Sequence, residues 1–253
     1  MQFASLGSGS RGNALLIKTK QTCVMLDNGF SVRETERRLA RFNVSADTLN
    51  AIVVTHEHAD HINGVGVLAR KFNIPVYATR GTLMAKRLGE LPVTNYINNH
   101  AAFEIEDLHI QGFPVPHDAR EPCQFVFSDG KCRLAVLTDT GRSTVHIEAQ
   151  ISSCDALILE CNHDIDLLQQ GVYPYSVKQR VGGEYGHLNN RQAADILMAI
   201  DTSRLQHIVA AHLSEKHNEI ALAKNAISGA LGCEQDWIGI ADQDHGLAWR
   251  EIC

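Results

Sequence analysis

His56-Glu57-His58-Ala59-Asp60-His61 directly follows an apolar run at residues 51–54. These six residues supply three imidazoles and two carboxylates, at the end of a segment whose pattern predicts a buried strand. Histidine occupies only 13 of 253 positions, so a chance H-x-H-x-D-H is rare in a chain of this length. Imidazole nitrogens and carboxylate oxygens are preferred ligands of Zn²⁺ and related cations. The stretch therefore predicts a metal-binding loop that follows a strand.

Ligand-type residues follow apolar runs at four other places in the sequence. They are Asp27, His117, Asp139 and His212. Layered α/β domains place their sites at strand ends, so these side chains are expected to converge on the loop at residues 56–61. Each residue alone has an ordinary interpretation, Asp as a turn residue and His as a surface or core group. Together with the His-rich loop, they favour one shared metal site.

Two histidines compete for the last ligand position of this site. His212 ends an apolar run at residues 207–211, whereas His187 follows the glycine-rich residues 182–186. A rigid strand end holds a ligand better than a flexible loop does. We therefore assign His212 to the metal and His187 to the substrate.

Short apolar runs recur along the sequence with helical patterns between them, which predicts an α/β (α+β) layered domain. Strands are predicted at residues 14–18, 23–26, 51–54, 76–78, 109–113, 124–127, 133–137, 156–159, 207–210 and 247–250. Helices are predicted at residues 32–42, 62–72, 190–199 and 220–230. No low-complexity linker or repeat divides the sequence, so residues 1–253 are expected to form a single domain.

The composition excludes several classes of protein. A net charge of −6 disfavours gripping long duplex DNA by charge alone, so a nucleic-acid role would need a local cationic site such as bound metal. Seven cysteines without a C-x-x-C pair argue against a disulfide framework and a thiolate zinc site. The sequence has no signal-peptide pattern and no apolar stretch of transmembrane length, so a cytoplasmic location is expected.

Gly7-Ser8-Gly9-Ser10-Arg11-Gly12 matches the dinucleotide-binding pattern G-x-G-x-x-G. That pattern binds a dinucleotide where it follows a strand and opens a helix, whereas here a predicted strand follows it. A hairpin turn whose glycines take positive φ is the favoured interpretation. The turn could still present backbone N–H groups to a phosphate near the metal site.

With these motifs the chain resembles the metallo-β-lactamase fold superfamily, whose signature is H-x-H-x-D-H. Asp27, His117, Asp139 and His212 fall in the order of its remaining motifs. The similarity extends over nearly the whole chain to the YycJ (WalJ) branch of this superfamily. The motifs shared with that branch are Ser8-Gly9-Ser10-Arg11-Gly12-Asn13, Thr138-Asp139-Thr140-Gly141, Glu160-Cys161-Asn162-His163-Asp164, Gly186-His187-Leu188-Asn189-Asn190 and Ala211-His212-Leu213-Ser214.

The resemblance implies a four-layer αβ/βα sandwich with two divalent metal ions in a cleft between two sheets. The implied ligands are His56, His58 and His117 for one ion, Asp60, His61 and His212 for the other, and Asp139 for both. Asp27 would orient ligands from behind, and Asp60 would also act in catalysis. Zn²⁺ is the expected metal, and Mn²⁺ and Fe²⁺ are alternatives because they share such ligands.

The resemblance also implies a hydrolase. The branch is similar to 5′-to-3′ exonucleases, which implies a phosphodiesterase acting on single-stranded nucleic acid, with DNA preferred to RNA. Two cations would supply an activated water and attract an anionic phosphate to this acidic protein. The chain has no room for the additional β-CASP domain of ribonuclease J, which disfavours processing of long RNA. The expected substrate contacts are Ser8, Ser10, Asn13, His163 and His187.

Three alternative functions stay open at this point. A small-molecule hydrolase of the same fold would act on a thioester, lactam or cyclic phosphodiester. A redox diiron protein would typically carry an acid in place of His56 or His58, and both are histidine here. A non-catalytic binding module is disfavoured by the complete ligand set.

Overall fold

The computed structural model describes residues 1–253. The strands are β1 (Gln2–Gly7), β2 (Ala14–Lys18), β3 (Cys23–Leu26), β4 (Ala51–Val53), β5 (Val76–Ala78), β6 (Thr94–Tyr96), β7 (Ala102–Ile105), β8 (Leu108–Pro114), β9 (Cys123–Ser128), β10 (Arg133–Leu137), β11 (Ala156–Glu160), β12 (His207–Ala211), β13 (Gly239–Ile240) and β14 (Leu247–Glu251). The α-helices are α1 (Val32–Ala40), α2 (Ala59–Ile62), α3 (Val65–Phe72), α4 (Arg80–Leu83), α5 (Val145–Ile151), α6 (Ile165–Gln170), α7 (Tyr175–Val181), α8 (Asn190–Ala199) and α9 (Ile220–Leu231). Three short 3₁₀ helices are η1 (Ala46–Thr48), η2 (Lys86–Leu88) and η3 (Gln235–Trp237).

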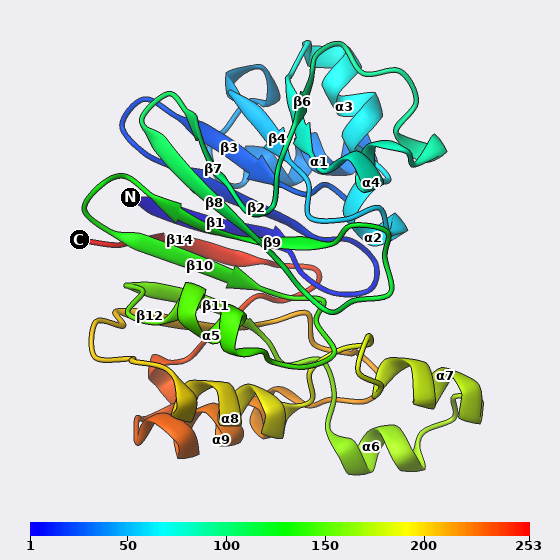
Figure 1. The fold of residues 1–253 in the computed structure, drawn as a ribbon, viewed down its shortest axis with the longest axis vertical. Coiled ribbons are helices and arrows are strands. Elements are labelled where there is room, and N and C mark those ends of the chain that lie inside the picture. The colour runs from blue at the N-terminus through cyan, green and yellow to red at the C-terminus, as the bar shows by residue number, and fades with distance from the viewer.

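The strands form two seven-stranded sheets, ordered β14-β1-β2-β3-β4-β5-β6 and β13-β12-β11-β10-β9-β8-β7. Each sheet has an antiparallel half of hairpins and a parallel half, β3 to β6 in the first and β10 to β13 in the second. Figure 1 shows α1 to α4 on one side of the paired sheets and α5, α8 and α9 on the other. The four-layer sandwich expected from the sequence is confirmed.

Three buried apolar clusters separate the four layers. Side chains alternate across a strand, so Ala51 and Val53 of β4 lie in the cluster between the sheets. Ile52, between them in sequence, lies in the cluster beneath α1 and α3. Because both faces of each sheet are covered, the strands read as continuous apolar runs. This pattern explains why all ten predicted strands are present, with β2, β3, β5 and β10 at their predicted bounds.

The helix predicted over residues 62–72 is wrong at its start. Two helices occupy this region, α2 and α3, and Gly64 lies between them. A Cβ atom at Gly64 would overlap the Phe30 carbonyl oxygen, so the chain passes too close to a neighbouring segment for any other residue. The break leaves α2 as a separate helix of four residues, which carries Asp60 and His61.

The glycine-rich residues 7–12 form the turn between β1 and β2, as predicted, and open no helix. Gly9 and Gly12 have φ angles of 145° and 149°, which residues with a side chain rarely adopt. All seven cysteines are free thiols, in agreement with the sequence. None of the helices reaches the length and apolarity needed to cross a bilayer.

Candidate metal centre

The predicted ligand-type residues converge at one end of the space between the two sheets. Asp27 follows β3 and His56 follows β4, two neighbouring parallel strands of the first sheet. His117, Asp139 and His212 follow β8, β10 and β12 of the second sheet. Figure 1 shows this end of the molecule marked by α2 and α7, whereas both chain termini lie at the other end. Tertiary folding therefore brings together residues that are up to 185 positions apart, from Asp27 to His212.

Three of these residues have an unusual backbone conformation. Asp27, Asp139 and His212 have φ angles of 59°, 51° and 55°, in the left-handed region. A non-glycine residue there costs about 1–3 kcal/mol and persists where its surroundings enforce it. Each of the three thus turns the chain sharply at a strand end and aims its side chain into the shared space. Such strain concentrates at functional sites.

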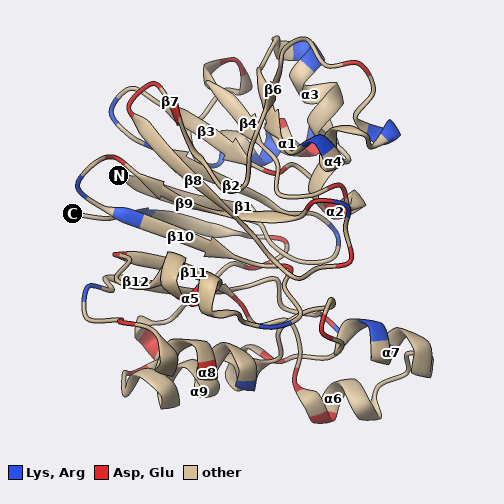
Figure 2. Ribbon diagram, viewed as in Figure 1, with Lys and Arg blue, Asp and Glu red and all other residues tan.

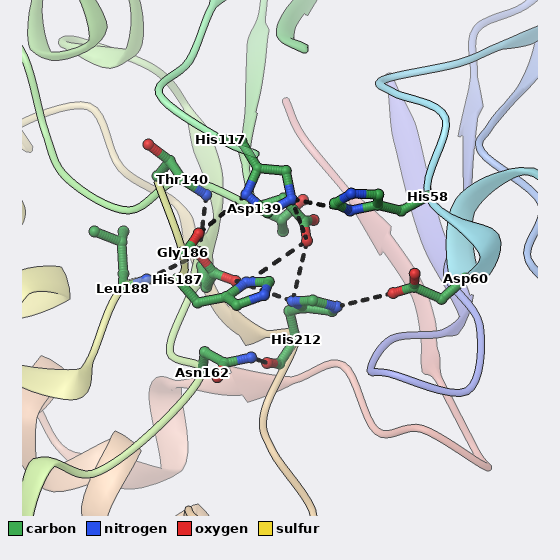
Figure 3. Close-up of polar contacts among 12 residues, drawn as sticks. His58, Asp60, His117, Asp139, Thr140, Asn162, Gly186, His187, Leu188 and His212 are labelled. Carbon is green, nitrogen blue, oxygen red and sulfur yellow. Dashed lines mark hydrogen bonds and ion pairs between the residues drawn. The ribbon is translucent and has the colours of Figure 1, made fainter. Parts of the chain in front are cut away.

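The potential ligand atoms form four overlapping groups, each with its atoms within 4.8 Å of one another. Two of them share no residue: one is His56, His58 and His117, and the other is Asp60, His61 and His212. Asp139 joins these two, because its carboxylate also groups with His56 and His61, and in the fourth group it lies with Glu160, His187 and His212. Figure 3 shows His58, His117, Asp139, His212 and Asp60 directed toward one another.

Several polar atoms that face this space have no partner. They are Nε2 of His56, Nε2 of His212 and Oδ2 of Asp139, all buried without a hydrogen bond. Buried polar groups are otherwise nearly always satisfied, because an unpaired one is costly. Bound divalent cations would satisfy these atoms, and the donor set of imidazoles and carboxylates is one that such cations prefer. The residues present therefore fit divalent metal binding.

Asp27 fixes the ring of His61. Its Oδ2 accepts a hydrogen bond from His61 Nδ1 at 2.8 Å, while Oδ1 accepts from the backbone N–H of Thr55 at 2.8 Å. The other ring nitrogen of His61, Nε2, then faces Asp60 and Asp139, each at 3.4 Å. Asp27 therefore contacts the ring nitrogen that faces away from Asp60 and Asp139.

Glu160 is a site residue that the sequence reasoning missed. Its Oε1 accepts hydrogen bonds from His187 Nδ1 at 2.8 Å and His212 Nδ1 at 2.9 Å, and the side chain is fully buried. Burial raises the pKa of Glu160, but the two histidines outweigh it and lower the pKa to about 2. The carboxylate therefore stays ionised and orients both rings. The signal was available, since Glu160 closes the apolar run of β11 as Asp139 follows that of the adjacent β10.

A cleft of about 280 Å³ opens over the ligand groups. Its lining includes Asp60, Asp139, His187 and His212 from the centre, and Val177, Arg180 and Val181 from α7. Arg180 is the one Lys or Arg side chain in this lining, and its Nε donates to Asp118 Oδ2 at 2.5 Å across the cleft. In Figure 2 the central strands are almost free of charge, while charged residues lie on helices and loops, α7 among them.

The five expected substrate contacts have different surroundings. Ser10 and His187 line the cleft. Ser8 and Asn13 instead support the ligand loops: Ser8 Oγ accepts from the His212 backbone N–H at 2.9 Å, and Asn13 Nδ2 donates to Asp60 Oδ2 at 3.2 Å. His163 lies outside the cleft and lines a separate cavity. The sequence motifs therefore mix residues that face the cleft with residues that hold its walls.

Comparison with known proteins agrees with this architecture. A family model described as "Beta-lactamase superfamily domain" matches residues 22–208. The chain belongs to this superfamily and has its metallo-β-lactamase fold. Within it, the chain is similar to the exodeoxyribonuclease YycJ of Bacillus anthracis, with 35% identity over 96% of this chain and 92% of that protein. The exodeoxyribonuclease WalJ of Streptococcus pneumoniae serotype 2 is 32% identical over 94% of this chain and 91% of that protein.

Solved structures show the same fold. Zn²⁺-bound PqqB from Methylobacterium extorquens superposes with a TM-score of 0.76 at 17% identity, and the match covers 100% of both chains. The match to YhfI from Bacillus subtilis, a metallo-β-lactamase fold protein, has a TM-score of 0.75 at 16% identity. The resemblance to the superfamily and to its YycJ (WalJ) branch, inferred from the motifs, is confirmed by the relatives and the family model.

Proposed function

We propose that this protein is a metal-dependent exonuclease that hydrolyses phosphodiester bonds of single-stranded DNA from the 5′ end. The observation that carries this proposal is a complete set of metal-ligand residues at the base of an open cleft. Its support from relatives is similarity along almost the whole chain to two proteins named exodeoxyribonucleases.

The proposed site holds two divalent ions, with Zn²⁺ expected and Mn²⁺ or Fe²⁺ as alternatives. The proposed ligands are His56, His58 and His117 for one ion, Asp60, His61 and His212 for the other, and Asp139 for both. When bound, such ions lower the pKa of water toward ~7 and polarise a phosphoryl oxygen.

Asp60 is the proposed catalytic carboxylate. Burial raises its pKa, but the adjacent His61 and His212 lower it far more, to well below the usual range. The carboxylate of Asp60 therefore stays ionised. Because its side chain is 23% exposed at the cleft wall, it can reach both the ligand cluster and the attacking water. We propose that it orients that water toward the phosphorus atom.

His187 and Arg180 are the proposed contacts to the substrate phosphate. His187 Nδ1 donates to Glu160. Burial lowers the pKa of His187, but Glu160 and Asp139 outweigh it and raise the pKa, which favours the protonated ring. In that form Nε2 can also donate a hydrogen bond in the cleft, to the leaving oxygen or to a phosphate oxygen. Arg180 supplies a permanent positive charge in a protein whose net charge is −6. Lys178, also on α7, donates to the Gln169 carbonyl and is absent from the cleft lining.

The proposed preference for a single strand and a free end follows from the position of the cleft. The site lies between two sheet layers, which admit an unpaired strand more easily than a duplex. A terminal phosphate anchored by Arg180 and Ser10 would place the next phosphodiester bond over the ligand cluster, which favours removal of nucleotides from an end.

Digestion of end-labelled oligonucleotides tests the proposal. The metal-loaded protein is incubated with single-stranded DNA labelled at the 5′ or the 3′ end, with matched RNA and duplex DNA alongside. Early release of short 5′ products from single-stranded DNA is the expected result, with binding that weakens as salt increases. No cleavage of any strand, together with rapid hydrolysis of a thioester or lactam, would assign the protein to the small-molecule hydrolases of this fold.

A further inference from the structure

A second cavity lies on the other side of α7 from the metal cleft. Its volume is about 230 Å³. The lining residues are His163, Ile165, Leu168, Gln169, Lys178, Gln179, Gly182 and Asn189. α7 separates the two spaces, because Val177, Arg180 and Val181 line the cleft whereas Lys178 and Gln179 line the cavity. No residue of this helix is buried, and α7 alone separates the metal cleft from the second cavity.

His163 forms a buried part of the cavity wall. The residue is only 2% exposed, and its Nδ1 atom is buried with no hydrogen-bond partner. A Cβ atom built on Gly182, on the opposite wall, would lie 3.8 Å from His163 Nε2, so this nitrogen is directed at the cavity. Burial lowers the pKa of His163 to about 4, and the ring is therefore uncharged at neutral pH. A neutral imidazole offers one donor and one acceptor.

The remaining polar groups of the cavity are mostly amides. Gln169 and Gln179 have side chains without hydrogen bonds to protein, and the Nδ2 group of Asn189 is likewise free, since only its Oδ1 caps α8. Ile165 and Leu168 supply an apolar surface. The one charged side chain, Lys178, already donates to the Gln169 carbonyl at 2.5 Å. Uncharged donors and acceptors beside an apolar surface suit a planar heterocycle better than a phosphate.

We propose that this cavity is a nucleobase-binding subsite, where the heterocycle of a nucleotide contacts His163, Gln169 and Gln179. The inference rests on the proposed nuclease function and extends it. A strand crossing α7 would keep a phosphate in the metal cleft, beside Arg180, and place a neighbouring base in the cavity. Amide side chains pair with the edges of bases through two hydrogen bonds, which would give the enzyme a preference for the base at that position.

Gly182 provides a way to block the cavity without disturbing its walls. Its φ is −87°, which other residues adopt, and an added Cβ would make only ordinary contacts of 3.4 Å with Leu168 and the Lys178 carbonyl. The Gly182→Leu variant is therefore expected to fill the cavity while the protein stays folded. Gly229→Leu is the matched control, since a Cβ there meets nothing within 4 Å and Gly229 does not line the cavity. Gln179→Leu, on exposed α7, removes the amide at nearly constant size.

The first measurement uses single-stranded oligonucleotides that carry one abasic residue at successive positions from the 5′ end. With the wild-type protein, an abasic residue at one position is expected to raise KM about tenfold, as expected for the loss of base contacts. Gly182→Leu should raise KM for the intact strand by a similar factor, change kcat less than about twofold, and abolish the response to the abasic residue. Gln179→Leu should show part of this effect, and Gly229→Leu none.

The second measurement is binding of uncharged deoxynucleosides to the metal-loaded protein, followed by NMR. If nucleosides bind and Gly182→Leu weakens that binding at least about tenfold, the cavity is a nucleobase site. If the abasic series is flat at the same time, the cavity binds a free nucleotide and not a base of the substrate strand. A flat abasic series together with no nucleoside binding would overturn the proposal. Absence of all nuclease activity would overturn the proposed function instead, and nucleoside binding would still decide what the cavity holds.

Discussion

Asp27 and Asp60 carry the same functional group in the same site but have different partners. Asp27 is 4% exposed, and both of its carboxylate oxygens accept hydrogen bonds, from Thr55 and from His61. Asp60 lines the cleft, and its carboxylate accepts from Asn13 and lies 3.4 Å and 3.5 Å from the Nε2 atoms of His61 and His212. A carboxylate that orients a ligand acts through that ligand, whereas one that faces the substrate can act on it directly. The two residues should therefore differ in what their loss removes.

Substitution of each Asp by Asn tests this difference. Asp60→Asn should reduce kcat at least about a hundredfold while the fold persists, because the proposed catalytic charge is lost. Asp27→Asn should weaken metal affinity by ~10–100-fold, as expected for a residue that orients a ligand. Asp47→Asn, at an exposed position of η1, is the control. Steady-state kinetics measure kcat, metal titration measures the affinity for metal, and circular dichroism measures whether the fold persists. A near-normal kcat in metal-loaded Asp60→Asn would refute the catalytic role of Asp60.

His187 and His212 share Glu160 as a partner but have different exposures. The His212 side chain is 3% exposed and that of His187 is 21% exposed in the cleft. Because only His212 lies within the group formed with Asp60 and His61, its loss should leave one metal position incomplete.

The expected result is that His212→Ala lowers the metal content from about two ions per chain toward about one, whereas His187→Ala retains both ions and loses activity. Elemental analysis of the purified variants gives the metal content, and a digestion assay gives the activity. Loss of metal from His187→Ala with full retention in His212→Ala would exchange the two assignments.

At the scale of elements, short helices and tight turns position the ligands. α2 has only four residues, yet it carries Asp60 and His61. Gly64 ends it by allowing the chain to pass against Phe30, and the Gly64 N–H donates to the Asn28 carbonyl at 2.9 Å. The backbone N–H of Asn28 in turn donates to the His61 carbonyl at 2.7 Å. The orientation of α2 thus depends on close backbone packing.

Gly64→Ala is expected to destabilise the protein by about 1–3 kcal/mol, because its methyl group would overlap backbone. It should also weaken metal binding, since α2 must shift. Gly229→Ala is the matched control: this glycine is inside α9 with open space around it, so alanine should stabilise by about 0.5–1 kcal/mol. Urea unfolding of both variants gives the free energies. Equal stability of the two variants would show that the packing at Gly64 is loose.

At the scale of the whole molecule, the two ends of the chain pair at one edge of the first sheet. β14 pairs with β1, with Gln2 opposite Glu251, and the central core draws on strands of both sheets. We therefore propose that residues 1–253 fold as one domain. The ligands come from both sheets, so bound metal would join the two halves of the sandwich.

Removal of metal is expected to abolish activity and to lower stability. A metal that binds only the folded state contributes RT ln(1 + [L]/Kd), about 4 kcal/mol at a thousandfold excess over Kd. Without it, His56, Asp139 and His212 retain unpaired buried atoms. Thermal unfolding and activity, each measured with EDTA and after re-addition of Zn²⁺ or Mn²⁺, check both effects. Unchanged activity and melting temperature in EDTA would contradict the metal assignment.

The sequence by itself determined ten of the fourteen strands, the metal-binding loop and the superfamily. Its local signals are strong because strands buried on both faces must be apolar, as at residues 51–53, and because clustered histidines are rare. Asp27, His117, Asp139 and His212 could be singled out because each follows such a run. The start of α3 could not be predicted, since the break at Gly64 results from contact with Phe30, far away in sequence.

Only the tertiary structure decided which residues face the cleft and which support it. Ser8 and Asn13 share a motif with Ser10, yet hydrogen bonds to His212 and Asp60 turn them toward the ligand loops. His163 resembles His187 in sequence context but lies on the other side of α7. The physical reason is that the direction of a side chain in a loop depends on contacts between distant segments. Sequence spacing specifies those contacts only within a strand or a helix.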